Sequence, residues 1–230
     1  MTDDLFSPRG LSGRTLTRTD LAPLAGGTPQ TVTDCDLEEA DLSGLDLTGW
    51  RFERCNLRKA DCSGTKLEGS VWQGCRAPFV SFVGANLSEA VFSGGDFNNS
   101  VWRRAILTSA KFVGIKLTGA DFSEARAMHV QFEEVLLVSA KLPGFSFRKE
   151  ALRRVDFSGA DLRKGDFRMT VFEDCSLREA MVSGSRFEGS DLRGADLGGL
   201  RLVDAGLFRG ATISREQAGQ LLGELGLNVR

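Results

Sequence analysis

The sequence contains no tyrosine and a single histidine, and its 230 residues include only five prolines and five cysteines. None of its hydrophobic runs approaches the roughly 18 apolar residues of a membrane-spanning helix. The first ten residues, MTDDLFSPRG, lack the basic flank and the apolar core of a secretory signal peptide. Because 41% of the residues are hydrophobic and 26% are charged, we expect a folded cytoplasmic protein.

The sequence also lacks a large excess of either positive or negative charge. The formal net charge is −2, which argues against direct nucleic-acid binding, because nucleic-acid-binding proteins owe most of their affinity to a basic surface. The charge is nevertheless spread unevenly. Residues 1–49 carry nine acids and three bases, whereas residues 101–149 carry four acids and eight bases. The N-terminal part of the chain is therefore acidic and its middle part basic.

What the sequence has instead is a period of five residues, clearest in CDLEEADLSGLDLTGWRFERCNLRKADCSG at 35–64. An apolar residue recurs at every fifth position from Leu37 to Leu207, which makes thirty-five consecutive units. Nearly all of these centres are Leu, Phe, Trp, Val or Cys. An α-helix would need a period of 3.6 residues and a β-strand a period of 2, so neither explains the pattern.

A second restricted position lies two residues before each centre, where small residues such as Cys35, Ala40 and Ala60 recur. Residues two apart on an extended segment point to the same side, so each unit sends one small and one large side chain inward. Gly, Ser, Glu and Arg dominate the last two positions, as water-exposed corners require. A chain that repeats a short extended step and a corner must coil into a solenoid.

A step of twenty residues sorts the centres into four columns. One column is rich in aromatic rings and contains Phe52, Trp72, Phe92, Phe112, Phe132, Leu152, Phe172 and Leu192. The absence of tyrosine fits such an interior, because a phenol hydroxyl there would lack a hydrogen-bond partner. The columns therefore predict a coil of four five-residue units.

These units resemble the pentapeptide-repeat family, whose consensus is A-(D/N)-L-x-x. The match is ADLSG at 40–44, ANLSE at 85–89, ADFSE at 120–124 and ADLGG at 195–199, and it extends over residues 30–212. The resemblance implies an all-β fold, a right-handed quadrilateral β-helix with four units per coil. At twenty residues per coil the chain makes about nine coils, stacked at an inter-strand spacing of about 4.8 Å.

The ends of the chain depart from the repeat. Residues 1–29 are predicted to form an N-terminal cap, with a coil one residue out of phase and a short loop at 22–29 of undetermined role. Residues 30–212 form the β-helix, and residues 213–230 form a C-terminal helix followed by an extended tail. Ser214 and Gln217 match a capping box at the start of this helix.

Ala218, Leu221, Leu222 and Leu225 then follow at the spacing of one apolar helix face. The helix is expected either to cap its own rod or to join two rods end to end, because a last coil exposes apolar interior and unpaired backbone. The chain resembles the gyrase-protecting members of the family, of the MfpA and albicidin-resistance type. A similar ending forms their dimer interface, so the resemblance implies a homodimer through these four residues.

Side chains suited to catalysis or metal binding are few. His129 falls at an outward corner, and no Ser/His/Asp set can be built around it. Four cysteines occupy small inward positions and one occupies a centre, where Cys behaves as a small hydrophobe: Cys35, Cys55, Cys75, Cys175 and Cys62. The first three lie in one column, but a coil offers no fourth metal ligand and a reducing compartment disfavours a disulfide. The sequence predicts no enzyme, cofactor or metal.

The acidic residues form the most informative group, because Asp recurs at the outward position before the centres. One interpretation is that Asp or Asn is simply the residue this position prefers. The other follows from the resemblance: regular carboxylates on a rod imitate the phosphates of a duplex and enter the DNA-binding saddle of DNA gyrase or topoisomerase IV. The residues expected to bind this partner are Asp161, Asp166, Glu173, Asp174, Asp191 and Asp196.

Two features bear on this expectation. The basic pairs Arg103–Arg104, Arg153–Arg154 and Arg163–Lys164 interrupt the acidic surface. The unbroken phase from 35 to 209 excludes the long loops that the Qnr members insert between coils, so the build is nearer to MfpA. The leading hypothesis is a dimeric protein that protects a type II topoisomerase from poisons, or inhibits it, and so confers antibiotic resistance. The alternative is a rigid interaction scaffold with another partner.

Three residues depart from the repeat in its interior. Trp50 and Phe145 are oversized for a small inward position, and we expect them to bend the wall. Glu150 occupies a small inward position, where an unpaired carboxylate would be costly. We expect a local distortion of the wall at this point, with Glu150 paired to Arg153 or Arg154.

Overall fold

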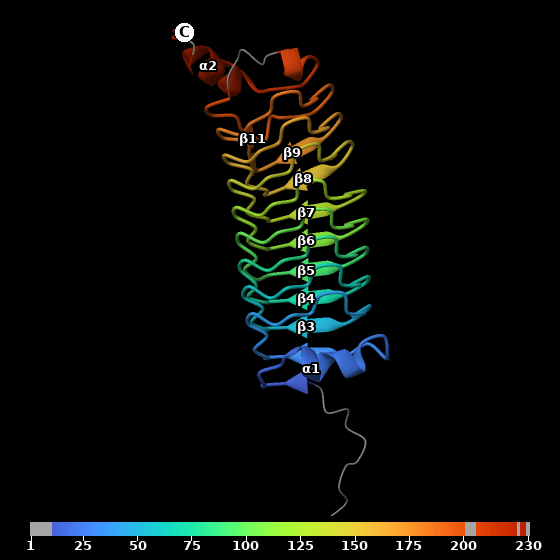
Figure 1. Cartoon of the computed structure of the whole chain (residues 1–230). Coiled ribbons are helices and arrows are strands. Elements are labelled where there is room, and N and C mark those ends of the chain that lie inside the picture. The colour runs from blue at the N-terminus through green and yellow to red at the C-terminus, as the bar shows by residue number, and fades with distance from the viewer. Residues whose placement is uncertain (1–10, 201–205, 225, 229–230) are drawn as a thin grey trace, which may run out of the picture.

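The computed structural model describes residues 11–200, 206–224 and 226–228. They form a four-sided parallel β-solenoid of about nine turns with short helices at its two ends (Figure 1). This confirms the predicted fold class. No helix among the described residues is both long enough and apolar enough to cross a membrane.

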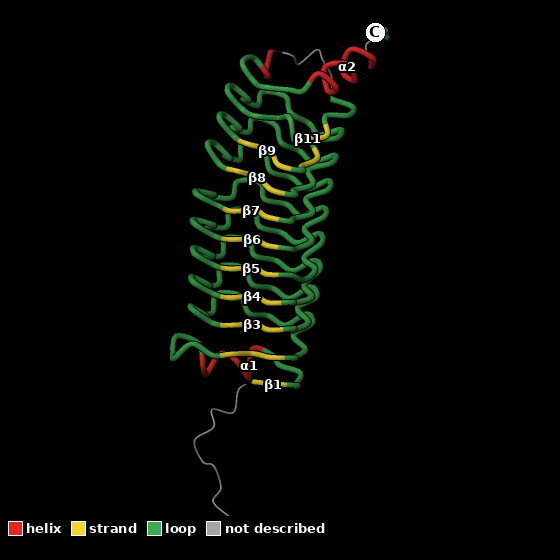
Figure 2. The backbone as a smooth tube through the Cα atoms, turned by 180° about the vertical axis from the view of Figure 1, so that it is seen from behind, coloured by secondary structure: helices red, strands yellow, loops and turns green. Residues whose placement is uncertain are grey.

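One face, here called the first face, carries the regular strands (Figure 2). Its nine strands pair in parallel and in sequence order. Strand β2 pairs with β3 so that Val32 faces Phe52, and β3 pairs with β4 so that Phe52 faces Trp72, a step of twenty residues. The nine are β1 (Leu11–Ser12), β2 (Thr31–Thr33), β3 (Arg51–Glu53), β4 (Val71–Gln73), β5 (Val91–Ser93), β6 (Lys111–Val113), β7 (Gln131–Glu133), β8 (Ala151–Arg153) and β9 (Val171–Glu173).

The other faces are held mostly by isolated bridges with the same twenty-residue step. The second face has its centres at Leu37, Leu57 and onward, the third begins with Leu42 and the fourth with Leu47. A short second sheet on the second face joins β10 (Cys175–Ser176) to β11 (Ala195–Asp196). The corners between faces regularly place a residue at positive φ, such as Gly44 at 68°, which explains why Gly recurs there.

The core is a continuous column of side chains from the centres and the small positions, as the period predicts. Aromatic centres stack from coil to coil: Phe92 lies 5.6 Å from Trp72 and 5.0 Å from Phe112 between ring centroids. Buried indole N–H groups find partners at the small positions, since Trp72 and Trp102 donate to the hydroxyls of Ser70 and Ser100. Among the described residues, no buried side-chain polar atom lacks a hydrogen-bond partner.

The first coil is out of register with the rest by one residue. Leu11 faces Val32, a step of twenty-one residues. This coil also contains helix α1 (Arg18–Leu21) and the 3-10 helix η1 (Ala22–Leu24), where the repeat alone would suggest another extended unit. The cause is local, because Thr17 and Asp20 form a capping box that starts α1.

The last coil corrects the prediction of an unbroken phase up to 209. The ring of Phe187 stacks on Phe208 at 4.6 Å, twenty-one residues along the chain, so Phe208 takes the place expected for Leu207. The backbone agrees, since Asp191 bridges Thr212, also twenty-one residues away. One additional residue has therefore entered this coil. Helix α2 (Arg215–Glu224) follows and lies at one edge of the end of the rod (Figure 1).

A break in the wall separates residues 125–133 from residues 145–153, and we call it the open seam. Strands β7 and β8 pair only at Glu133 and Arg153. On the fourth face, Ile106 bridges Arg126 and Ser146 bridges Asp166, but Arg126 and Ser146 do not bridge each other. Above this level the coils lean away from the axis of the lower coils (Figures 1 and 2).

Packing explains the open seam. Phe145 stands at a small inward position that holds alanine in the two preceding coils, and its ring lies 5.3 Å from Phe147. The expected distortion at Glu150 is present, but the expected pairing is wrong. Arg153 pairs with Glu173, and Arg154 pairs with Glu133 and Glu134. The Glu150 side chain lines a cavity of about 250 Å³ in the seam instead.

Candidate partner-binding surface

The position before each centre has a structural task. The side chain of Asp61 accepts a hydrogen bond from the backbone N–H of Ser63, two residues on, at 2.9 Å. Asn56 accepts the same bond from Arg58 at 3.2 Å. Asp and Asn favour such corners because their short side chains bond the backbone two residues ahead. The regular acids are therefore explained in part by the turns they stabilise.

Most of the six carboxylates expected to bind a partner are paired with arginine. Asp161, Asp166 and Asp191 each form an ion pair with the arginine two residues on, at 2.7, 2.5 and 2.6 Å. Glu173 pairs with Arg153 at 2.7 Å on the neighbouring coil. Asp196 pairs with Arg178 at 3.0 Å. Asp174 is exposed and forms no ion pair in the described part of the chain.

These ion pairs change the electrostatics of the six positions. The hydrogen-bonded guanidinium of Arg163 holds the pKa of Asp161 below its usual value. Arg168 and Arg193 lower the pKa of Asp166 and Asp191 in the same way. The carboxylates stay ionised at neutral pH, but each carries a cation beside it. The local field is therefore weaker than six bare carboxylates would produce.

The structure also spreads these six residues around the rod. Asp161 lies on the third face and is almost buried, with 7% of its surface exposed. Asp166 lies on the fourth face and Asp196 on the second. The other three, Glu173, Asp174 and Asp191, gather at the first face, where Val171 of β9 bridges Asp191. The fold therefore does not bring the six together into one patch.

The N-terminal coils show a similar neutralisation between neighbouring coils. Arg54 binds both carboxylate oxygens of Asp34 at 2.7 Å. Three more acids of residues 31–50 are matched by bases one coil higher, in the pairs Glu38–Arg58, Glu39–Lys59 and Asp46–Lys66. Asp41 pairs with Arg18 of the first coil, and Asp36 forms no ion pair with a described residue. The acidic excess of the first 49 residues is thus largely paired where the structure describes it.

The C-terminal helix closes the last coil of its own rod. Ser214 and Gln217 form the predicted capping box, with the Ser214 N–H donating to Oε1 of Gln217 at 2.7 Å. The Nε2 group of Gln217 donates to the carbonyl oxygens of Leu192 and Ala195 at 2.7 and 2.6 Å. Sequence reasoning missed this second role, because the repeat does not show which carbonyls at its end lack partners.

The residues predicted to form a dimer divide into two groups. Ala218 and Leu221 are half-buried on the end of the rod. Leu222 is exposed to 37%, close in sequence to the exposed Leu227. Leu225 lies outside the described residues. The helix therefore caps its own coil and still presents apolar surface to the outside.

The five cysteines are buried free thiols. Burial raises the pKa of the Cys62 thiol, and the neighbouring Cys55 thiol together with burial raises the pKa of Cys75. Such thiols stay protonated and unreactive at neutral pH. Among the residues that the structure describes, no group of three or more His, Cys, Asp and Glu side chains is arranged to hold a metal ion.

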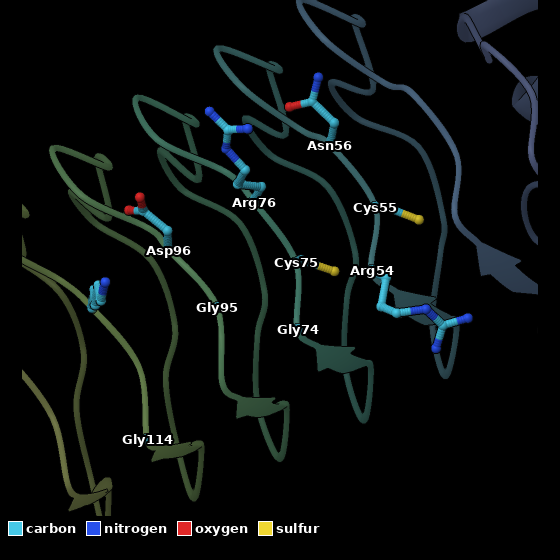
Figure 3. A pocket seen from close by; sticks show the side chains of 10 residues that line it. Arg54, Cys55, Asn56, Gly74, Cys75, Arg76, Gly95, Asp96 and Gly114 are labelled. Atoms are coloured by element: carbon cyan, nitrogen blue, oxygen red, sulfur yellow. The ribbon is translucent and has the colours of Figure 1, made fainter.

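A shallow groove of about 450 Å³ runs over the corner beside two of these cysteines (Figure 3). Cys55 and Cys75 point away from it into the rod, on successive coils. The groove exists because glycine supplies its floor. At Gly95, with φ of 103°, an added Cβ would lie 2.3 Å from the Cys75 carbonyl oxygen. Two basic residues of its rim, Arg76 and Lys116, flank Asp96 in one column.

Comparison with known protein families agrees with the repeat. The model of the pentapeptide repeat region matches residues 45–122. The model of pentapeptide repeats in eight copies matches residues 131–168 and 170–205. Together these matches cover more than half of the chain. No curated protein sequence matches it significantly.

Solved structures of similar shape come from several sources. A trypsin-treated variant of QnrB1, a plasmid-mediated fluoroquinolone resistance protein, is 20% identical with a TM-score of 0.51, covering 95% of this chain and 100% of that chain. HetL, a pentapeptide repeat protein involved in heterocyst differentiation regulation in Nostoc sp. strain PCC 7120, is 18% identical with a TM-score of 0.46, covering 81% and 86%. An Arabidopsis thaliana thylakoid-lumen protein is 25% identical with a TM-score of 0.34, covering 64% and 90%. The likeness to QnrB1 is one of fold.

Proposed function

Because the chain belongs to the pentapeptide-repeat family, we propose that it is a non-enzymatic scaffold whose partner is DNA gyrase or another type II topoisomerase. In this proposal the rod enters the DNA-binding saddle of the enzyme and protects it from poisons such as fluoroquinolones. The observation that supports it is the rod itself. Its corners present Asp or Asn at a regular coil spacing, and its overall fold is shared with a fluoroquinolone resistance protein.

The contacts would rest on carboxylates without a cation beside them. Asp61, Asp156 and Asp174 form no ion pair in the described chain, and Asp61 bridges Asp41 on the coil below. A basic groove on the partner attracts evenly spaced negative charge of this kind. The proposed dimer, joined through Ala218, Leu221, Leu222 and Leu225, would double the length of this surface.

The ion pairs favour a second candidate function. Five of the six expected contact residues are neutralised by arginine. A rod of this charge also suits a scaffold that recognises a different protein by shape and local charge. The two candidates differ in one measurable respect, because binding by charge imitation must weaken sharply as ionic strength rises.

Gyrase supercoiling and poison-stabilised cleavage assays with the purified protein test the first candidate. The protein should reduce fluoroquinolone-induced cleavage at concentrations near that of the enzyme, and the effect should fall between 50 and 300 mM salt. A variant with Asp61, Asp156 and Asp174 changed to Asn should lose protection. A matched variant with Asp34, Asp41 and Asp46 changed to Asn should keep it, because these carboxylates are already paired with Arg54, Arg18 and Lys66. If a large excess of protein alters neither supercoiling nor cleavage, the topoisomerase proposal is wrong and the scaffold remains.

The dimer can be tested separately by sedimentation. The protein should sediment as a dimer at micromolar concentration, and Leu222→Asp should convert it to a monomer. Gln220 is an exposed residue of the same helix, so Gln220→Asp provides a control for the added charge and should remain dimeric. A monomeric wild-type chain would remove the dimer from the proposal.

A further inference from the structure

The basic residues of the rod fall into two classes. In residues 31–70, all five Lys and Arg side chains form ion pairs. In residues 151–200, seven of eight do so. In residues 71–150 the proportion is reversed: of nine basic side chains only Lys141 pairs with an acid in the described part of the chain, Asp121 at 3.7 Å. The sequence showed an excess of bases in this region, but only the structure shows that they lack partners.

Three of the unpaired cations form a diagonal row that begins at the corner before the fourth face and crosses that face, here called the arginine row: Arg104, Arg126 and Arg148. All three are exposed. Each follows the previous one by twenty-two residues, which is one coil upward and two residues along the chain. On a straight and regularly stacked wall such a step covers roughly 8 Å, from a coil spacing of about 4.8 Å and a strand rise of about 3.3 Å per residue. The open seam lies between Arg126 and Arg148, where the coils do not bridge. Lys149 extends the row at its upper end.

The open seam cuts through the same surface. On the coils below, the N–H of Leu107 donates to the Arg126 carbonyl, and the N–H of Arg126 donates to the Ala105 carbonyl. At the seam the equivalent bonds are missing. The N–H groups of Ala127 and Ser146 and the carbonyl oxygens of Ala125 and Ser146 have no hydrogen-bond partner within the described ranges. They face one another across the gap, between Arg126 below and Arg148 above.

From this coincidence we propose that the arginine row and the open seam form a docking site for an acidic, extended polypeptide segment of a partner protein. The carboxylates of the segment would pair with Arg126 and Arg148. Its backbone would supply both the carbonyl oxygens and the N–H groups that the seam lacks. Alternate side chains of an extended segment lie about 6.6 Å apart on one side, so carboxylates at alternate positions of the segment all face the row. The site does not depend on a topoisomerase partner.

A nucleic acid fits these observations less well. A phosphate backbone offers acceptors only, so it would leave the carbonyl oxygens of Ala125 and Ser146 unpaired. The net charge of −2 gives little long-range attraction to a duplex. The unpaired cations of the row also span only about three coils, roughly 15 Å. The surface therefore matches a short acidic peptide better than a duplex.

Fluorescence anisotropy with a labelled (Glu-Gly)8 peptide tests the proposal on the full chain. The wild-type protein should bind this peptide at 50 mM salt and release it at 300 mM salt, and it should bind a (Gln-Gly)8 peptide at least tenfold more weakly. Arg126→Glu combined with Arg148→Glu should weaken binding at least tenfold. The matched control is Arg76→Glu with Lys116→Glu, which makes the same change in net charge at unpaired cations of the second face and should weaken binding less than twofold.

Hydrogen exchange of the same complexes locates the peptide. Binding should slow exchange in residues 125–130 and 145–151 and leave residues 105–110 unchanged. Three results would overturn the proposal: no binding of the acidic peptide, an equal loss in both double variants, or protection elsewhere on the rod. The same binding measurement is repeated with a labelled 20-base-pair DNA duplex in place of the peptide. If it binds more tightly than the peptide through Arg126 and Arg148, the site is a nucleic-acid site and the proposed partner class is wrong.

Discussion

The Nε2 group of Gln217 donates a hydrogen bond to the carbonyl oxygen of Leu192, twenty-five residues earlier in the chain, at 2.7 Å. The same amide also binds the carbonyl oxygen of Ala195, and Gln217 itself is buried to 92% of its surface. The Leu192 carbonyl also accepts the N–H of Ala195, whereas Gln217 is the donor that the structure describes for the Ala195 carbonyl. Removing the Gln217 amide therefore leaves the Ala195 carbonyl at the closed end without a donor among the described residues.

We expect Gln217→Ala to lower the free energy of unfolding by about 1–3 kcal/mol, the usual cost of a buried polar group left unpaired. Urea denaturation followed by circular dichroism measures this change. Gln220→Ala, at an exposed position of the same helix, should change stability by less than about 0.5 kcal/mol. Equal effects of the two substitutions would mean that the helix does not cap the rod through Gln217.

The stacked rings of the interior predict a second contrast. Phe92 is fully buried between Trp72 and Phe112, whereas the ring of Phe79 is 53% exposed at a corner. Phe92→Ala should lower the free energy of unfolding by about 3–5 kcal/mol, because it removes the ring and leaves a cavity. Phe79→Ala should cost less than about 1 kcal/mol. Thermal unfolding measures the difference. Equal unfolding midpoints for the two variants would contradict the prediction.

The interior was predictable from the sequence because its rule is strictly local. A centre such as Phe92 and a small residue such as Ala90 both point inward wherever the chain is extended, so a period of five fixes their burial without knowledge of distant contacts. The capping box at Ser214 and Gln217 was predictable from a different local pattern, a serine followed three residues later by a glutamine. These elements depend on residues close together in the sequence.

The remaining features depend on contacts between coils. The stacking of Phe187 on Phe208 shows an inserted residue that the sequence conceals, because Leu207 is as apolar as Phe208. The sequence shows that Trp50 and Phe145 are both oversized for their positions, but only the structure shows that the coils separate at Phe145 and stay paired at Trp50. The arginine partners of Asp161 and Asp196 come from rotamers and from adjacent coils. The sequence thus identified the acidic residues but not the arginine side chains that pair with them.

The corner hydrogen bonds predict which substitutions of Asp the rod tolerates. Asn56 already makes the bond that Asp61 makes one unit later, so Asp61→Asn should leave stability within about 0.5 kcal/mol of wild type. Asp61→Ala removes the acceptor of the Ser63 N–H and should cost about 1 kcal/mol. Chemical denaturation of both variants separates the two roles of the residue. If both lose the same stability, charge rather than the corner bond determines the effect.

The arginine-paired carboxyls predict how stability depends on pH. The pKa values of Asp161, Asp166 and Asp191 are lowered in the folded state by their arginine partners. As the pH falls below about 4, the unfolded chain takes up these protons first, so stability present at neutral pH is lost on acidification. The urea midpoint should be constant between pH 7 and 5 and should decrease below pH 4. Changing all three to Asn should flatten that decrease; an unchanged slope would exclude these pairs as its source.

The open seam predicts a local weakness that hydrogen exchange can measure without any ligand. The N–H groups of Ala127 and Ser146 have no partner among the described residues, whereas Leu107, at the equivalent place one coil below, donates to Arg126 at 2.8 Å. Exchange at Ala127 and Ser146 should therefore be at least 100-fold faster than at Leu107, on the order of the protection that one backbone bond in a stable core confers. Phe145→Ala should slow exchange at the seam, because a small residue there lets the coils approach. Equal exchange at Leu107 and Ala127 in the wild-type protein would show that the coils are closed in solution, and the docking site proposed at the seam would lose its backbone component.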